Sequence, residues 1–475
     1  MKQKKPISKK LFVGSLLLTA VVSGGVVFSV DHFTNNTLMP NQVASTDELA
    51  KVHALYDVLE ANYYKKVDTD KLVDGALKGM TEALDDPYTT YLEKPEATEL
   101  NQSLSDSFEG IGATLTLIDG IPQIAQAPIK DTPAEKAGLK AGDQILAVDG
   151  KETTDKTLTE IVNQVRGEKG TDVTLTLKRG DDTFKVTLTR DKIPLYSVAS
   201  SIDDKHPEIG KIEITTFAEK TATELKEAIE SLRKQGATAF VIDLRQNPGG
   251  LLDQVSNMAS MFLKDGQTIV QLEDRDGTIQ KTVASKELDG GFKVTEPTVV
   301  LVDGGSASAS EIFAGAVNES ANIPLIGTKT FGKGTVQTIT EYQDGSEVKL
   351  TIKKWLTPNK NWIHEKGITP TIEVDYPAFV YATPLPTDQE LSLGVSATAV
   401  KSLNTYLSGL GYGDLSGEQF TDATKTAVEQ FQQDQGLSVT GVVDAQTVKK
   451  IQEAAATLLK EKDAMYERAL VELEK

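Results

Sequence analysis

Apolar residues first recur at helical spacing near the start of the chain. One such stretch is ELAKVHALYDVLEANYYKKV, and a second follows it and ends at DDPYTTYL. Steps of three and four residues place side chains on one face of a helix, so residues 46–104 are predicted to be helical and are a candidate dimerisation segment. The apolar positions are Val52, Leu55, Val58, Leu59 and Tyr63 in the first helix and Leu72, Ala76, Met80 and Leu84 in the second.

The pattern changes to short strands and glycine turns over residues 105–190. FEGIGATLTLIDG, IPQIAQ and TDVTLTLKRGDDTFKVTLTR are strand patterns, and the longer helix is predicted within DGKETTDKTLTEIVNQVRG. These features predict a small, mostly β domain. Gly110, Ile111 and Gly112 form a glycine-lined edge, to which an extended peptide can add as a further strand.

Strands alternate with helices over residues 191–380, as in KIEITTF, TATELKEAIESLRKQG, AFVIDLR and LLDQVSNMASMFL. This alternation is typical of an α/β domain whose sheet is covered by helices. After the linker YATPLPTDQ, residues 388–456 are predicted to form a three-helix module. Residues 457–475 are predicted to be a solvated, charged helical tail and are a second candidate for a dimer contact.

The N-terminus combines a lysine-rich tip with an apolar run. MKQKKPISKK contains five lysines and no acid, and residues 11–30 contain no charged side chain. A helix of about 20 residues spans a bilayer, and preceding lysines favour a cytoplasmic tip. Residues 1–45 are therefore predicted to be tip, single-pass membrane anchor and linker, with an extracytoplasmic ectodomain. A cleaved signal peptide is the alternative.

Composition narrows the function further. The chain of 475 residues has a formal net charge of −19 and no cysteine. This acidity argues against a nucleic-acid binder, which needs a basic face. The absence of cysteine excludes disulfides, thiol catalysis and cysteine-based zinc sites.

Candidate chemistry lies in GGSASASEIFAGAVNES, where three serines alternate with alanines between a strand and a helix. A serine hydroxyl becomes a nucleophile when a base removes its proton, and histidine is the usual base. Of the four histidines, His32 adjoins the predicted anchor, and His53 and His206 lie far upstream of the serines. His364, beside Glu365, follows the serines in the same domain and stays open as a base.

Lysine is the alternative base. GTKTFGKGTVQTI places Lys333 between Gly332 and Gly334, among apolar and hydroxyl residues. A lysine with a pKa of about 10.4 cannot act as a base near neutral pH, but burial lowers that pKa by several units. Gln337 offers an amide that can hold the amine without adding charge. A phosphate-binding loop is excluded because the P-loop spacing is missing.

An oxyanion hole is predicted upstream. DLRQNPGG, residues 243–250, is a strand end followed by a Pro-Gly-Gly turn that opens a helix. Such a turn directs backbone N–H groups outward, toward a developing negative charge. An ordinary strand-to-helix turn has the same pattern.

Together, DLRQNPGG, GSASASE and KTFGKGTVQ resemble the carboxyl-terminal processing proteases, also called tail-specific proteases, and LDDPYTTYL resembles their helical lead-in. The resemblance covers residues 46–376 and implies a multi-domain α/β chain with a crotonase-like protease core. It also implies that Ser308 is the nucleophile, Lys333 the base and Gln337 the orienting amide. The family, and not the spacing, selects Ser308 over Ser306 and Ser310, which are then expected to be turn and N-cap serines.

The resemblance extends to ligand-binding groups. The oxyanion donors are expected to be the N–H groups of Ala309 and of either Gly249 or Gly250. FEGIG through AGLKAGDQILAVDG resembles a PDZ domain, which implies that a peptide C-terminus pairs beside residues 111–114, with its carboxylate at the glycine-lined edge. Arg166 is a candidate link between the bound peptide and the catalytic side, with a solvated arginine as the alternative.

The C-terminal module resembles a peptidoglycan-binding domain, on TKTAVEQFQQDQGL and GVVDAQTVKKI. A spacer or a dimer-forming element is the alternative. We therefore expect a membrane-anchored, extracytoplasmic Ser–Lys endopeptidase that acts on proteins with exposed C-termini, gated by its PDZ-like domain. We expect a homodimer that needs no metal or cofactor. The rivals are a catalytically silent PDZ and cell-wall-binding scaffold and a hydrolase that uses His364.

Overall fold

The computed structural model describes residues 27–28, 46–118 and 120–475. Of the predicted membrane span, only β1 (Val27–Phe28) is described, as a short strand that pairs in parallel with β18 (Thr335–Glu341). The remainder of that span and His32 lie outside the described residues. Among the helices that are described, none has the length and apolarity needed to cross a bilayer.

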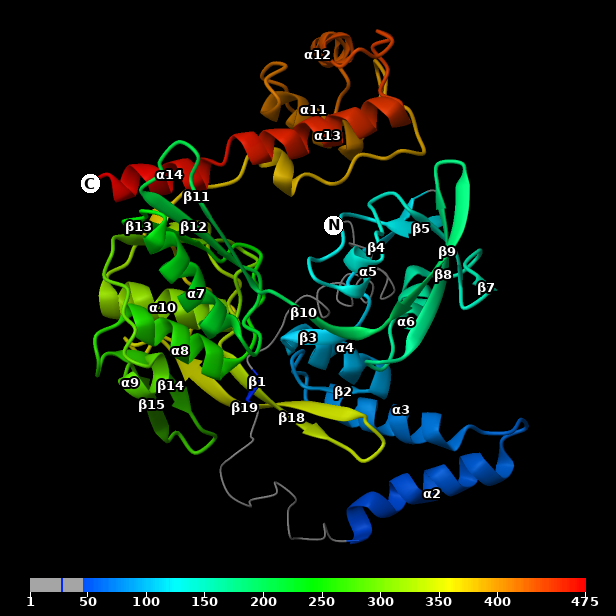
Figure 1. Cartoon of the computed structure of the whole chain (residues 1–475), viewed down its shortest axis with the longest axis vertical. Helices are drawn as coiled ribbons and strands as arrows, with labels where there is room; N and C mark the ends of the chain where they lie inside the picture. The colour runs from blue at the N-terminus through cyan, green and yellow to red at the C-terminus, as the bar shows by residue number, and fades with distance from the viewer. Residues whose placement is uncertain (1–26, 29–45, 119) are drawn as a thin grey trace, which may run out of the picture.

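The lead-in region contains both helices that the apolar spacing predicts (Figure 1). Its elements are α2 (Thr46–Asn62), α3 (Thr69–Glu82), β2 (Thr90–Leu92) and α4 (Lys94–Leu104). The apolar stripes of α2 and α3 are not covered, since Leu55, Val58 and Met80 remain 56–59% exposed. The pattern therefore identified an apolar face that the described residues leave open.

A strand-rich module follows, with the sheet order β4-β5-β6-β8-β9 and β7 paired to β6. Alternate side chains of β8 are buried, as a strand with one face on a core requires. A two-stranded ribbon of β3 and β10 connects the module to the rest of the molecule. The elements are β3 (Ser107–Gly110), β4 (Leu115–Ile118), β5 (Ile121–Ile124), α5 (Pro133–Lys136), β6 (Gln144–Val148), β7 (Lys151–Glu152), α6 (Leu158–Val165), β8 (Asp172–Arg179), β9 (Asp182–Thr189) and β10 (Asp191–Pro194).

The core is built on two sheets. The first has the order β11-β12-β13-β16-β17-β20 and is parallel from β12 onward. The second contains β18, β19, β14 and β15, with β2 added at β19. Their elements are β11 (Val198–Ile202), β12 (Ile209–Ile214), α7 (Thr221–Lys234), β13 (Ala239–Asp243), α8 (Leu252–Phe262), β14 (Thr268–Glu273), β15 (Ile279–Val283), α9 (Lys286–Asp289), β16 (Thr298–Val302), α10 (Ala309–Ala321), β17 (Leu325–Gly327), β19 (Glu347–Leu356) and β20 (Ile372–Glu373).

Helices α7, α8 and α10 share one hydrophobic core with both sheets. The central strand β16 is buried along its whole length because helices cover both of its faces. Parallel order also brings the carboxyl ends of β13 and β16 to one edge, where the DLRQNPGG turn and the serine turn begin. This edge is where α/β folds usually carry their sites.

The C-terminal module has its own core of three helices, lying apart from the protease core (Figure 1). Its elements are η1 (Ala378–Tyr381), α11 (Thr398–Gly409), α12 (Asp422–Asp434) and α13 (Ala445–Glu461). The side chain of Phe379 in η1 stacks on Tyr406 of α11, so the linker is bound to the module.

The helical structure predicted for residues 457–475 is confirmed, but the segment is not solvated on all sides. Helix α14 (Ala464–Leu473) returns to the first sheet and lies on the face opposite α10 (Figure 1). Met465 and Ala469 are buried there. Arg245, just after β13, forms paired hydrogen bonds of 2.9 and 2.7 Å with the carboxylate of Asp463 at the start of α14. The charges of this helix therefore serve docking as well as solvation.

Candidate active site

The three alternating serines differ in what their hydroxyls bind. Ser306 Oγ donates to the carbonyl of Leu244 at 2.8 Å, and Ser310 Oγ donates to the carbonyl of Asn247 at 2.8 Å. Both hydroxyls therefore tie the serine turn to the DLRQNPGG turn. Ser308 is itself the N-cap of α10, so the expectation that a neighbouring serine holds that position is wrong.

The backbone at Ser308 is strained. Its φ of 55° and ψ of −110° are unusual for a residue with a side chain. Such strain persists only where surrounding bonds enforce it, and it is concentrated at functional sites. Here Ala307 N–H donates to the carbonyl of Asn247 at 3.0 Å, and Ser308 N–H donates to Glu311 Oε2 at 2.9 Å.

Glu311 connects the serine turn to the lysine loop, a role that the sequence reasoning missed. Its Oε2 also accepts from Lys333 N–H at 2.8 Å, and its Oε1 accepts from Thr330 Oγ1 at 2.6 Å and Gly332 N–H at 2.7 Å. Burial raises the pKa of Glu311, while these hydrogen bonds act in the opposite direction. The available signal was its position three residues after a serine at a helix start, the capping-box spacing.

Lys333 lies fully buried on the loop before β18. Its Nζ has no hydrogen-bond partner among the described residues. Burial, followed by the charge of Lys349, lowers the pKa of Lys333 to about 7, and the charges of Asp86 and Glu311 oppose this shift. A lysine with this pKa is substantially neutral near pH 7 and can accept a proton.

The flanking glycines permit the burial that the sequence predicts. A Cβ at Gly332 would lie 2.8 Å from the N of Gly367, and one at Gly334 would lie 2.8 Å from the N of His364. Any other residue would therefore push the lysine loop away from the segment at 364–367.

Gln337 lies in β18, buried, but it does not bind Lys333 in this structure. Its Nε2 donates to Thr335 Oγ1 and to Thr351 Oγ1, both at 3.0 Å. Its Oε1 has no partner within the described part of the chain, as is also true of Lys333 Nζ. The predicted hydrogen bond between Gln337 and Lys333 is thus not formed. Gln337 Oε1 nevertheless lacks a donor, and the Lys333 amine could supply one.

The oxyanion turn distinguishes the two candidate glycines. Gly249 N–H donates to Asn247 Oδ1 at 2.9 Å, so it is already engaged. Gly250 has a φ of 148°, and a Cβ there would lie 2.2 Å from the carbonyl oxygen of Phe217. The N–H groups of Gly250 and Ala309 have no acceptor among the residues that the structure describes. Gly250 is therefore the better candidate for the second oxyanion donor.

His364 is placed against the lysine loop. Its Nδ1 accepts from Gly334 N–H at 3.3 Å, and its ring stacks on Trp362 with centroids 5.2 Å apart. His53 is exposed in α2, and His206 lies in the turn before β12. The role that the geometry gives His364 is to brace the loop that carries Lys333.

The predicted peptide edge is partly occupied. Gly110 pairs with Asp191 in the ribbon, and the carbonyls of Ile111 and Gly112 accept from Ala134 N–H and Ile129 N–H at 2.8 and 3.0 Å. These bonds engage carbonyl oxygens, so the pairing of a peptide beside residues 111–114 stays a prediction. The edge strands of the described sheet are β4 and β9, and β4 begins directly after residues 111–114.

Arg166 joins the strand-rich module to the lead-in region. Its Nη1 donates to Gln102 Oε1 of α4, and its guanidinium lies 4.8 Å from the ring centroid of Phe108. Burial lowers the pKa of Arg166. Arg166 is thus half-buried, and its contacts are with α4 and β3.

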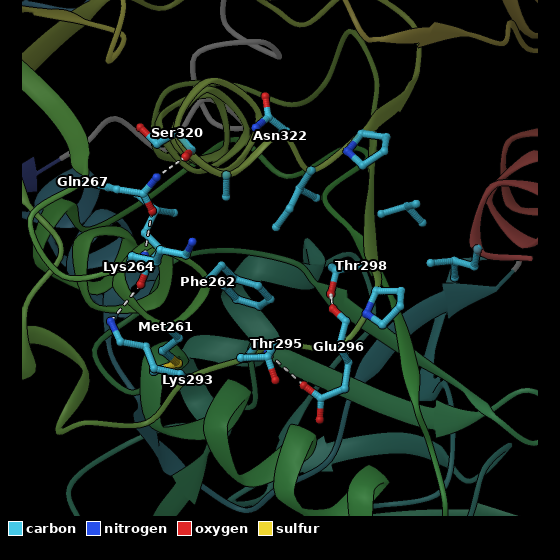
Figure 2. A pocket seen from close by; sticks show the side chains of 18 of the residues that line it. Met261, Phe262, Lys264, Gln267, Lys293, Thr295, Glu296, Thr298, Ser320 and Asn322 are labelled. Atoms are coloured by element: carbon cyan, nitrogen blue, oxygen red, sulfur yellow. Dashed lines mark hydrogen bonds between the residues drawn. The ribbon is translucent and has the colours of Figure 1, made fainter. Parts of the chain in front are cut away.

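A hollow of about 1010 Å³ lies at the opposite end of the core. Thr298, at the start of β16, lines it, whereas Ser308 follows the other end of that strand. Figure 2 shows hydrogen bonds between several of its polar residues, as in the pair Thr295–Glu296 and the contact between Gln267 and Ser320. It belongs to the amino ends of the strands and not to the catalytic edge.

Comparison with known proteins decides the family. The model of peptidase family S41 matches residues 208–374. The carboxy-terminal processing protease CtpA of Bacillus subtilis (strain 168) is 42% identical over 463 residues, which cover 97% of each chain. The chain belongs to peptidase family S41. This protein is a serine protease with the overall organisation of its carboxy-terminal processing relatives.

Two further proteins are similar to this chain. A probable CtpA-like serine protease of Staphylococcus haemolyticus (strain JCSC1435) is 38% identical, covering 98% of this chain and 91% of its own. The photosystem II D1 C-terminal processing protease has 28% sequence identity and a TM-score of 0.41, covering 78% of this chain and 94% of its own.

The accessory modules of this protease also match family models. A PDZ domain matches residues 124–179 and a putative peptidoglycan binding domain matches residues 396–451. The N-terminal domain of the activating protease CtpB matches residues 23–96. The PDZ and peptidoglycan-binding resemblances are confirmed at the level of the family.

Proposed function

We propose that this protease is a Ser–Lys endopeptidase in which Ser308 is the nucleophile and Lys333 the general base. The observation that carries the proposal is the fully buried amine of Lys333, with its pKa lowered to about 7. Its loop is bonded through Glu311 to the backbone of Ser308. The backbones of Lys333 and of the strained Ser308 are thus held by one buried carboxylate.

The proposed reaction follows from these roles. The Lys333 amine takes the proton of Ser308 Oγ, which attacks the peptide carbonyl. The N–H groups of Ala309 and Gly250 stabilise the oxyanion, and the lysine ammonium then protonates the leaving amine. Water hydrolyses the acyl-enzyme by the reverse sequence. These steps use no metal or cofactor.

The observed arrangement of Gln337 supports a resting form. In the active form we propose that its Oε1 turns to Lys333 Nζ, which would satisfy both unpartnered atoms. The hydrogen bonds from its Nε2 to Thr335 and Thr351 must then be exchanged.

Substrate selection is assigned to the PDZ domain. We propose that a free C-terminus adds to the open edge of β4, and that binding there changes the contact of Arg166 with α4. The module at 396–451 would then hold the enzyme at peptidoglycan. The lysine-rich N-terminus and its apolar run support a membrane anchor and an extracytoplasmic protease. The uncovered apolar faces of α2 and α3 support a homodimer. The crotonase-like assignment of the core stays a prediction.

The test uses the chain from about residue 44 onward and an unstructured protein substrate, with and without an added C-terminal peptide. We expect Ser308→Ala and Lys333→Ala each to reduce cleavage by about 1000-fold or more. Lys329, an exposed lysine of the same segment, provides the matched control, and Lys329→Ala should cleave normally. Normal cleavage by Lys333→Ala would exclude the Ser–Lys mechanism, and stimulation by the peptide would support gating.

The same assay separates the rivals. A silent scaffold predicts no cleavage by the wild-type protein at any peptide concentration. A histidine mechanism predicts that His364→Gln loses activity as fully as Ser308→Ala. The Ser–Lys mechanism predicts that His364→Gln keeps measurable activity, because His364 supports the lysine loop without exchanging the proton.

A further inference from the structure

Tyr88 lies over the proposed catalytic lysine, although it comes from a distant part of the chain. It belongs to the loop between α3 and β2. Lys333 Nζ lies 4.5 Å from the centroid of its ring. Tyr88 is half-buried, whereas Lys333 beneath its ring is fully buried.

The loop is held firmly in this position. Asp86 accepts from Tyr88 N–H at 3.0 Å and from Thr89 Oγ1 at 2.6 Å. Thr89 Oγ1 in turn accepts from Thr351 N–H of β19 at 3.0 Å. Thr351 Oγ1 also accepts from Gln337. The Tyr88 loop is therefore connected to Lys333 through the ring of Tyr88, and to Gln337 through Thr89 and Thr351.

The ring of Tyr88 also contacts a second pair of aromatic residues. His364 packs edge-on against Tyr88 with centroids 6.1 Å apart, and Trp362 stacks behind His364. Trp362 Nε1 donates to the carbonyl of Gly334 at 2.9 Å, directly after Lys333. Movement of the ring away from the amine would therefore break its contact with His364, which is itself bonded to the lysine loop.

We propose that Tyr88 is a positioning residue for Lys333, whose ring holds the amine in place and closes its pocket against water. This inference rests on the proposed function, because the value of an unsolvated amine is its use as a base. It makes the lead-in loop a part of the catalytic centre, in addition to the protease core.

Two effects of the ring on Lys333 oppose each other. A ring face attracts the ammonium and raises the lysine pKa, by about one and a half units at a desolvated site. Exclusion of water lowers the pKa, by about three units or more for a fully buried group. Exclusion therefore dominates, in agreement with burial as the leading cause of the lowered pKa.

The other charges that face Lys333 stay in place when the ring is changed. Lys349 of β19 disfavours the ammonium, whereas Asp86 of the same loop and Glu311 of α10 favour it. A series of variants at Tyr88 thus changes solvation and leaves these three charges constant.

The experiment titrates the Lys333 amine by NMR in protein labelled with ¹⁵N at lysine Nζ, with the signal assigned by its loss in Lys333→Ala. The wild-type midpoint is expected near pH 7. Tyr88→Phe should keep this midpoint, Tyr88→Leu should raise it, and Tyr88→Ala should raise it furthest, by about one pH unit or more. Tyr196, an exposed tyrosine, provides the control variant Tyr196→Ala, whose midpoint should not move.

Cleavage is measured on the same proteins across pH. Tyr88→Ala should lose about tenfold or more of the cleavage rate at pH 7 and recover part of it at pH 9, whereas Tyr88→Phe should stay within about twofold of wild type. A midpoint unchanged in Tyr88→Ala, or an equal loss of rate at every pH, overturns the inference. If Tyr88→Ala does not fold, the comparison of Tyr88→Leu with Tyr88→Phe decides it.

The failure of this inference is distinct from a failure of the proposed function. Normal cleavage by Lys333→Ala would remove the lysine from the mechanism, whatever its midpoint. An unmoved midpoint would remove Tyr88 and leave the Ser–Lys mechanism intact.

Discussion

Glu311 and Lys333 are both charged residue types, and both are completely buried in the same site. The carboxylate of Glu311 accepts four hydrogen bonds, all from within the site. The Lys333 amine has none from the described residues. The protein replaces the lost water at Glu311 and leaves Lys333 without a replacement. A buried ionisable group whose hydrogen bonds are all satisfied holds the structure together. A buried ionisable group without hydrogen bonds has a shifted pKa, which can serve catalysis.

Lys333→Met gives the sharpest contrast between the two residues. We expect cleavage to fall by about 1000-fold or more, because the base is removed. We also expect the free energy of unfolding at pH 7 to rise by about 1–3 kcal/mol, because a buried polar group without a partner is replaced by an apolar chain. Cleavage assays and urea unfolding measure both, with Lys329→Met as control. A loss of stability would mean that Lys333 is as structural as Glu311.

Glu311→Gln tests the opposite side of the comparison. An amide oxygen cannot accept all four of the donors that converge on the carboxylate, so some backbone N–H groups lose their acceptor. We expect the free energy of unfolding to fall by about 2–4 kcal/mol and cleavage to fall by about tenfold or more. Urea unfolding and cleavage rates measure these changes. Unaltered stability would show that the four hydrogen bonds do not hold the two segments together.

The pH dependence of stability should differ between wild type and Lys333→Met. The pKa of Lys333 is about 7 in the folded protein and 10.5 as its ordinary value. Between these values the unfolded chain binds a proton that the folded chain does not, so wild-type stability rises with pH. The advantage of Lys333→Met should therefore be greatest at pH 7 and shrink toward pH 10. Unfolding curves at pH 7, 8.5 and 9.5 measure this, and a constant difference would contradict the lowered pKa.

Thr330→Val should have the smallest effect. It removes one of the four hydrogen bonds of Glu311 together with the side-chain acceptor of Ile368 N–H, and it preserves the shape of the side chain. We expect a loss of about 1 kcal/mol in the free energy of unfolding and a change in cleavage of less than about fivefold. A loss of stability as large as that of Glu311→Gln would mean that the hydrogen bond from Thr330 supplies most of the stabilisation, and that the other three donors to Glu311 add little.

The two terminal helices show where prediction from the sequence succeeds and fails. The spacing of Leu55 and Val58 predicted a helix, and α2 is one, but these apolar residues are exposed in the described chain. Residues 457–475 were predicted to be solvated because they are highly charged. Met465 and Ala469 of α14 are nevertheless buried on the first sheet. The periodicity of apolar residues predicts which face of a helix can be buried. Whether that face is buried depends on a packing partner from elsewhere in the chain.

The sequence by itself determined the features that depend on near neighbours. These are the helices of the lead-in, the alternating strands of the PDZ domain, the buried strands β13 and β16, and the glycines that let Lys333 lie inside. Through family resemblance it also selected Ser308, Lys333 and Gln337, whose catalytic roles stay predictions.

Only the tertiary structure decided how distant residues meet. It bound the hydroxyls of Ser306 and Ser310 to the DLRQNPGG turn, engaged the N–H of Gly249, and placed Tyr88 over Lys333. It also left Gln337 turned toward threonines instead of the lysine. The physical reason is that hydrogen bonding and desolvation depend on which atoms are adjacent in space, and these atoms come from segments far apart in the chain.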